Sequence, residues 1–187
     1  KIKGEGLNLE NKKLEKGLIQ VYTGNAKGKS TAAFGLTVRA AGHGFKVIII
    51  QFMKTGNYYG EITGLKRLSP EVEVYSYGRE GFIHRNGVKP EDIVLAHDAL
   101  NHAERMMLEP ETDILILDEI NNALFFGLLT VKEVLEFIEK KPENVELVLT
   151  GRNAPTEIIE RAHLVTEMKE IKHPYQLGIG SRKGIEY

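Results

Sequence analysis

The sequence has no cysteine and almost no excess of either charge. Without cysteine the chain forms no disulfide, holds no metal through thiolates and offers no cysteine nucleophile. A net charge of −1 and a pI near 6.7 provide no basic field of the kind that gathers nucleic acid or an anionic membrane. We therefore expect no nucleic acid and no membrane as partner, and small or neutral molecules instead.

Long apolar runs are also missing. None approaches the ~20 residues needed to span a bilayer, and residues 1–17 contain no apolar signal-peptide core, so we expect a cytoplasmic protein. Those first residues are rich in lysine, asparagine and glutamate and predict a mobile arm. The remainder, residues 18–187, has a length and composition that predict a single α/β domain.

Short apolar, β-branched runs alternate with segments of helical character in this domain. The apolar runs predict strands at 18–23, 46–52, 72–77, 113–118, 145–150 and 164–171. Helices are predicted at 29–41, 90–108, 130–140 and 155–162. Near-continuous apolar strands that alternate with helices are typical of a single doubly wound, mostly parallel sheet with helices on both faces.

The stretch YTGNAKGKST, residues 22–31, resembles a phosphate-binding loop whose first glycine is displaced by one position. In the usual G-x-x-x-x-G-K-[ST] spacing that glycine would stand at 23, but this chain has Thr23 followed by Gly24. A predicted strand leads into the stretch and a predicted helix leaves it, which is the context that such a loop requires.

The loop has the chemistry to hold phosphates despite its displaced glycine. Its backbone amides can form an anion nest at a helix N-terminus, where Lys29 neutralises phosphate charge and Lys27 adds a second cation. The Ser30 hydroxyl can bind Mg²⁺. The alternative is a glycine-containing turn between strand and helix with solvated lysines, which the flanking elements disfavour.

A second part of a triphosphate site follows in ILILDEI, residues 114–120. Four apolar strand residues end there in Asp118 and Glu119, at the carboxyl edge of the predicted sheet, where ligands bind in open α/β folds. Carboxylates at this edge can hold Mg²⁺, or Mn²⁺ in its place, together with phosphate oxygens. The alternative is an acidic pair that merely caps a strand.

Residues 17–54 resemble the opening of the P-loop type of corrinoid adenosyltransferases, which act on ATP and cob(I)alamin or a precursor corrinoid. The family's T-G-N-G-K-G-K-[ST]-T-A-A-x-G loop, R-A-x-G-H-G turn and V-x-x-x-Q-F-x-K strand are matched apart from one loop position. Further matches are LDEI (117–120), VLTGR (148–152), KHPYQLGI (172–179) and KGIEY (183–187). The resemblance implies a P-loop NTPase-like (RecA-like) fold, and the displaced glycine is then a mark of this family.

The resemblance also implies a reaction. Cobalt(I) of a reduced corrinoid attacks C5′ of ATP and displaces inorganic triphosphate, with the nucleotide bound in reverse relative to ordinary P-loop ATPases. Such enzymes form homodimers in which the N-terminal arm covers a neighbouring nucleotide site. They receive electrons from a donor such as a flavoprotein.

The family's functional residues can be carried over to matching positions here. The nucleotide-binding and corrinoid-binding set comprises Gly24, Asn25, Ala26, Lys27, Gly28, Lys29, Ser30, Thr31, Arg39, Phe82 and His84. Catalytic roles are implied for Lys29, Glu119 and Phe82. Metal binding is implied for Ser30, Asp118 and Glu119.

Two departures from the family pattern bear on these roles. Ala26 stands where glycine is common, so the loop must avoid a positive φ there or hold a strained alanine. In GFIH, residues 81–84, Phe82 occupies the family's phenylalanine position but His84 replaces a tryptophan. Histidine at that position can pack as an aromatic ring, bond a corrin amide or ligate cobalt.

Two other classes of function stay open from the residues alone. One is a P-loop ATPase or kinase that acts at the γ-phosphate and releases phosphate or ADP. The other is a nucleotide-dependent switch or corrinoid carrier without turnover. The released product distinguishes the three, because only adenosyl transfer yields inorganic triphosphate.

Overall fold

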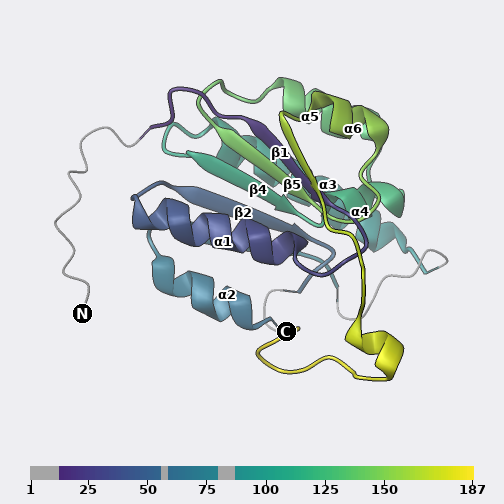
Figure 1. Cartoon of the computed structure of the whole chain (residues 1–187). Coiled ribbons are helices and arrows are strands. Elements are labelled where there is room, and N and C mark those ends of the chain that lie inside the picture. Colours follow the sequence, from purple (N-terminus) through teal and green to yellow (C-terminus); the bar gives the residue numbers. More distant parts are fainter. Residues whose placement is uncertain (1–12, 56–58, 80–86) are drawn as a thin grey trace, which may run out of the picture.

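The computed structural model describes residues 13–55, 59–79 and 87–187, which are built around one sheet (Figure 1). The sheet has six strands in the order β3-β2-β4-β5-β1-β6, and all neighbouring strands are parallel. The strands are β1 (Ile19–Thr23), β2 (Val47–Phe52), β3 (Val72–Tyr77), β4 (Ile114–Asp118), β5 (Glu146–Thr150) and β6 (Leu164–Glu167). Residues on β2, β4 and β5 are buried on both faces, which accounts for their continuous apolar runs.

Helices cover both faces of this sheet (Figure 1). On one face α1 (Lys29–Gly42) and α2 (Gly60–Leu65) pack over the side chains of Val47 and Ile49. On the other face lie α3 (Pro90–Leu108), α4 (Ile120–Phe125), α5 (Val131–Glu139) and α6 (Thr156–Arg161). Two short 3₁₀ helices, η1 (Lys66–Leu68) and η2 (Pro174–Leu177), complete the described elements.

The predicted doubly wound parallel sheet is confirmed, as are the four predicted helices to within a residue at each end. The prediction of a strand continuing to residue 171 is wrong, because β6 ends at Glu167. Its neighbour β1 ends at Thr23 and offers no further pairing partner. The chain turns instead over the loop, where the Met168 amide donates to the Thr23 carbonyl and the Met168 carbonyl accepts from the Ala26 amide.

Two short helices, α2 and α4, were not predicted from the sequence, whereas the equally short α6 was. α2 contains two glycines in six residues, which weakens any helical signal, yet Ile62 and Leu65 are each only 4% exposed. α4 begins directly after β4 without a connecting loop, so its apolar residues read as a continuation of the strand. Within the described ranges no helix combines the length and the apolar character that crossing a membrane requires.

Candidate nucleotide-binding site

The loop between β1 and α1 explains why its glycine stands at 24. Gly24 has φ 99° and Gly28 has φ 124°, both in the region that favours glycine. A Cβ on Gly24 would also lie 2.4 Å from the carbonyl oxygen of Met168, in the segment that crosses the loop. Thr23, at the usual glycine position, is the last residue of β1. Its hydroxyl accepts a hydrogen bond from the Ala154 amide at 3.3 Å.

Ala26 fits this loop without strain. Among the described residues the only non-glycine residues with positive φ are Met53, Glu119 and Asn153. The loop therefore avoids a positive φ at Ala26. Its amide donates to Met168 at 2.9 Å.

Two lysines of the loop are held by protein oxygens. Lys29 is 7% exposed, and its ammonium donates to the Ala26 carbonyl at 2.7 Å. Burial lowers the pKa of Lys29, while the nearby carboxylates Glu119 and Asp118 oppose the shift. The ammonium of Lys27 donates to the Ile185 carbonyl at 2.6 Å and pairs with Glu186 at 3.2 Å. A bound triphosphate would therefore have to replace these protein oxygens as the hydrogen-bond partners of Lys27 and Lys29.

Asp118 lies behind the loop at the end of β4 and is fully buried. One carboxylate oxygen accepts from the Thr150 hydroxyl at 2.8 Å, and the other accepts from Gln51 at 3.1 Å and Lys54 at 2.8 Å. Burial acts to raise the pKa of Asp118, but Lys54 and the hydrogen bonds from Ser30 and Thr150 outweigh it and lower the pKa. The carboxylate is thus charged and joins β2, β4 and β5 to the loop.

Glu119 follows Asp118 in a left-handed conformation with φ 68°. Its amide donates to the Thr150 hydroxyl at 3.0 Å, and one of its carboxylate oxygens accepts from the Asn122 side chain. Burial and the neighbouring Asp118 carboxylate raise the pKa of Glu119, whereas the cations Lys54, Lys29 and Arg152 lower it. The two adjacent acids therefore differ in their affinity for a proton.

Backbone strain gathers at this edge of the sheet. Met53, Glu119 and Asn153 each stand within three residues of the carboxyl end of β2, β4 or β5. A left-handed non-glycine residue costs on the order of 1–3 kcal/mol and persists where the surrounding structure enforces it, commonly at functional sites. This is also the edge where parallel α/β sheets bind ligands.

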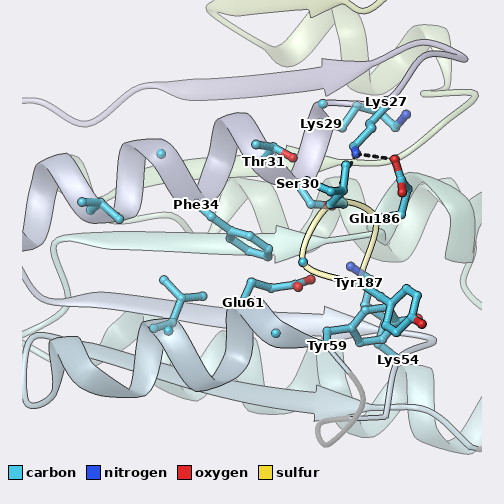
Figure 2. A pocket seen from close by; sticks show the side chains of 18 of the residues that line it. Lys27, Lys29, Ser30, Thr31, Phe34, Lys54, Tyr59, Glu61, Glu186 and Tyr187 are labelled. Atoms are coloured by element: carbon cyan, nitrogen blue, oxygen red, sulfur yellow. Dashed lines mark hydrogen bonds and ion pairs between the residues drawn. The ribbon is translucent and has the colours of Figure 1, made fainter. Parts of the chain in front are cut away.

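A cavity of about 760 Å³ opens in front of the loop (Figure 2). Residues 27–31 of the loop and helix α1 form its polar end, together with Glu119 and Lys54. Its apolar side lies between α1 and α2, where Phe34, Val38, Leu65 and Leu68 line it. Residues 184–187 of the C-terminal segment close a further side, and Figure 2 shows Glu186 reaching Lys27 there.

The structure brings together many of the predicted site residues but not all. Lys27, Gly28, Lys29, Ser30, Thr31 and Glu119 line the cavity, with Asp118 directly behind. The loop also contains Gly24, Asn25 and Ala26, which do not line the cavity. Arg39 is exposed near the end of α1 and does not itself line the cavity, so its phosphate contact stays a prediction. Phe82 and His84 lie outside the described residues.

Sequence reasoning missed several cavity residues. Lys54 ends a matched family segment and Tyr187 ends another, so the signal was present, but neither residue belongs to the phosphate-loop pattern. Phe34 and Glu61 carry no motif signal, because only the placement of α1 and α2 beside each other on one face of the sheet (Figure 1) brings them to the cavity.

The oxygen donors at the loop suit Mg²⁺. In the described ranges no three histidine, cysteine or acidic side chains gather into a metal cluster. The Ser30 hydroxyl interacts with the Asp118 carboxylate and helps to lower its pKa, so one hydroxyl and one carboxylate lie near each other at the loop. Mg²⁺ in phosphate sites is held by one or two carboxylates with substrate phosphates and water, so this donor set is sufficient.

Comparison with known proteins agrees with the geometry. The model of the family described as ATP:corrinoid adenosyltransferase BtuR/CobO/CobP matches residues 15–187. The chain belongs to this family. The matched range includes the loop, the Asp118–Glu119 pair and the C-terminal segment that lines the cavity.

Curated relatives support the assignment over most of the chain. A corrinoid adenosyltransferase of Pseudomonas aeruginosa is 39% identical, with 92% of this chain and 85% of the relative aligned. One from a Sinorhizobium species is 41% identical, covering 92% of this chain and 81% of the relative. One from Escherichia coli K12 is 34% identical, covering 92% and 87%.

Proposed function

We propose that this protein transfers the 5′-deoxyadenosyl group of ATP to the cobalt of a reduced corrinoid and releases inorganic triphosphate, in the formation of adenosylcobalamin. Family membership over residues 15–187 supports the reaction. The observation that carries the proposal is a phosphate loop that opens onto a cavity with a long apolar side. That cavity suits a bound nucleotide whose reacting atom is in the adenosyl part.

The reaction needs no nucleophile or base from the protein. An electron pair of cobalt(I) forms the cobalt–carbon bond, and the C5′–O5′ pair stays on the oxygen that leaves with triphosphate. The chain positions the nucleotide and neutralises the leaving group through Lys27, Lys29 and the loop amides. Mg²⁺ held by Ser30 and Asp118, with Glu119 beside them, would supply further positive charge to the leaving group.

The corrinoid is proposed to meet the protein through Phe82 and His84. The segment that carries them leaves β3 at the edge next to Lys54, since a Cβ on Gly78 would lie 2.5 Å from the Lys54 amide nitrogen. Arg79 joins the two ends of that segment by donating to the Gly87 carbonyl at 3.1 Å. An apolar ring at 82 would exclude water beneath cobalt, and an unchanged Co(II) spectrum in Phe82→Ala would contradict this role.

Assembly and reduction complete the proposal. We expect a homodimer in which residues 1–17 cover a neighbouring nucleotide site, and sedimentation at the mass of one chain would contradict it. We expect an external electron donor such as a flavoprotein to reduce cobalt, as the family resemblance implies. Mn²⁺ can take the place of Mg²⁺ at the proposed metal site.

The test is anaerobic incubation of the protein with reduced corrinoid and MgATP. The corrinoid absorption spectrum reports formation of the cobalt–carbon bond, and chromatography identifies the phosphate product. Triphosphate released in step with the spectral change is the expected result. Phosphate or ADP would indicate a γ-phosphate enzyme, and a bound nucleotide without product would indicate a switch or carrier.

A further inference from the structure

A third lysine reaches the cavity from the end of β2. The side chain of Lys54 is 12% exposed and lines the cavity (Figure 2). Its ammonium lies 2.8 Å from Asp118 Oδ2 and 5.2 Å from the centre of the Tyr59 ring. Because Ser30 interacts with the same carboxylate, Asp118 lies between Lys54 and the phosphate loop.

The backbone around Lys54 is built to hold this position. The preceding residue, Met53, is left-handed with φ 59°, which costs an ordinary residue free energy. Gly78 packs against the same two peptides, since a Cβ there would meet the Lys54 amide nitrogen at 2.5 Å and the Met53 carbonyl carbon at 2.6 Å. The backbone that directs Lys54 into the cavity is thus strained at Met53 and requires glycine at position 78.

Lys54 bonds one oxygen of the carboxylate that would hold the metal. Of the two Asp118 oxygens, one is bonded by Thr150 within the sheet, and the other is shared by Gln51 and Lys54. Gln51 and Thr150 are fully buried and do not line the cavity, whereas Lys54 does. Ser30 also lines the cavity and interacts with Asp118, but it is neutral. Lys54 is therefore the charged Asp118 partner that a cation or phosphate entering the cavity can displace.

We propose that Lys54 is a third cation of the substrate site: it competes with the divalent metal for Asp118 in the empty enzyme and turns to the triphosphate group when the metal binds. The inference rests on the proposed function and extends it. When C5′–O5′ breaks, its electron pair remains on the leaving phosphate, and a freed ammonium beside the loop would stabilise that added charge. Lys54 thereby protects a buried carboxylate before binding and assists the leaving group afterwards.

Metal binding without nucleotide tests the first half. Mn²⁺ titration followed by electron paramagnetic resonance needs neither corrinoid nor ATP. Lys54→Met is expected to bind Mn²⁺ about tenfold tighter than the parent, because the competing ion-paired hydrogen bond is gone. If Lys54→Met does not fold, Lys54→Gln, which keeps a neutral donor to Asp118, carries the same test.

Binding of inorganic triphosphate with Mg²⁺, measured by calorimetry, tests the second half. Lys54→Met is expected to lose about tenfold in affinity. Lys46→Met is the matched control: Lys46 precedes β2, pairs with Glu73 and does not line the cavity, so both affinities should match the parent. Mn²⁺ affinity no tighter than the parent's, or triphosphate affinity equal to it, would overturn the role of Lys54. Absence of adenosyl transfer by the parent would instead refute the proposed function.

Discussion

Among the described residues, the ion pairs Arg79–Asp92 and Lys54–Asp118 have similar geometry but lie in different surroundings. Arg79 Nε lies 2.7 Å from Asp92, and Lys54 Nζ lies 2.8 Å from Asp118; both carboxylate side chains are fully buried. Asp92 also accepts from the Lys89 amide at 2.8 Å and so caps the start of α3. Asp118 instead stands at the carboxyl edge of the sheet, behind a cavity.

The difference lies in how replaceable each cation is. Arg79 grips Asp92 with two nitrogens and also bonds the Gly87 carbonyl, so its charge is committed to the fold. Lys54 makes one bond to Asp118 from the wall of a cavity, beside two residues of strained backbone, Met53 and Glu119. All the hydrogen bonds of Arg79 described above are to groups of the protein that hold the fold together. Lys54 lies at the cavity, where a ligand could replace Asp118 as its partner.

Asp92→Ala should have the largest effect on stability. It leaves the partly buried Arg79 without its carboxylate partner and removes the cap of α3, which together cost roughly 3 kcal/mol, or about 6–12 °C in Tm. Burial acts to raise the pKa of Asp92, but Arg79 and the Lys89 amide lower it overall. The stabilisation is therefore fully present above the ordinary carboxyl pKa and is lost as pH falls below that value through the lower pKa of the folded state.

Thermal unfolding from pH 3 to pH 8 measures this effect, with exposed Asp98→Ala on α3 as control. MgATP affinity of the folded variant should equal that of the parent. A variant that unfolds like the parent at pH 7 would break the distinction between the two pairs.

Asp118→Asn should reduce adenosyl transfer strongly and stability only moderately, in contrast to Asp92→Ala. Asparagine keeps one acceptor oxygen for Lys54 and Gln51, and its amide nitrogen can donate to the Thr150 hydroxyl, so the loss of stability should be smaller than for Asp92→Ala. Adenosyl transfer should fall about 100-fold, because the charge that orders the loop and the metal is gone. Steady-state kinetics beside thermal unfolding checks both quantities, and a variant that keeps parental transfer would show Asp118 to be structural.

Lys29→Ala sharpens the comparison within the loop. Its ammonium is expected to meet phosphate in both ground and transition states, so MgATP affinity and transfer should fall together by roughly 10-fold to 100-fold. Calorimetry and single-turnover kinetics measure the two. Lys27→Ala should have a smaller effect, since exposed Lys27 is shared with Glu186 in the empty site. Parental nucleotide affinity in Lys29→Ala would count against the phosphate loop.

Glu119→Gln should have the smallest effect on the free energy of unfolding, and it should increase stability where Asp92→Ala decreases it. Because burial and Asp118 raise the pKa of Glu119, the folded state takes up a proton more readily than the unfolded state. Its ionisation therefore costs stability as pH rises above the ordinary value of 4.5. The variant should gain about 1 kcal/mol at pH 7 and nothing near pH 4. A lower Tm at pH 7 would contradict the electrostatic argument.

Elements with strong local signals were predictable from the sequence. The strands and long helices follow from hydrophobic periodicity, and the acidic pair was located because it ends the apolar run of β4. Glycine-containing α2 and the shortened β6 were not, since their form depends on what they pack against. The reason for Gly24 was equally hidden, because Met168 stands far along the chain.

The sequence by itself determined a parallel α/β fold, a phosphate loop with a displaced glycine and a carboxylate at the end of β4, because each depends on neighbouring residues or on one repeating pattern. Only the tertiary structure decided which charges meet. Lys54 and Asp118 are 64 residues apart, and Lys27 and Ile185 are 158 apart. Such contacts follow from strand order and from the path of the C-terminal segment, which periodicity does not encode.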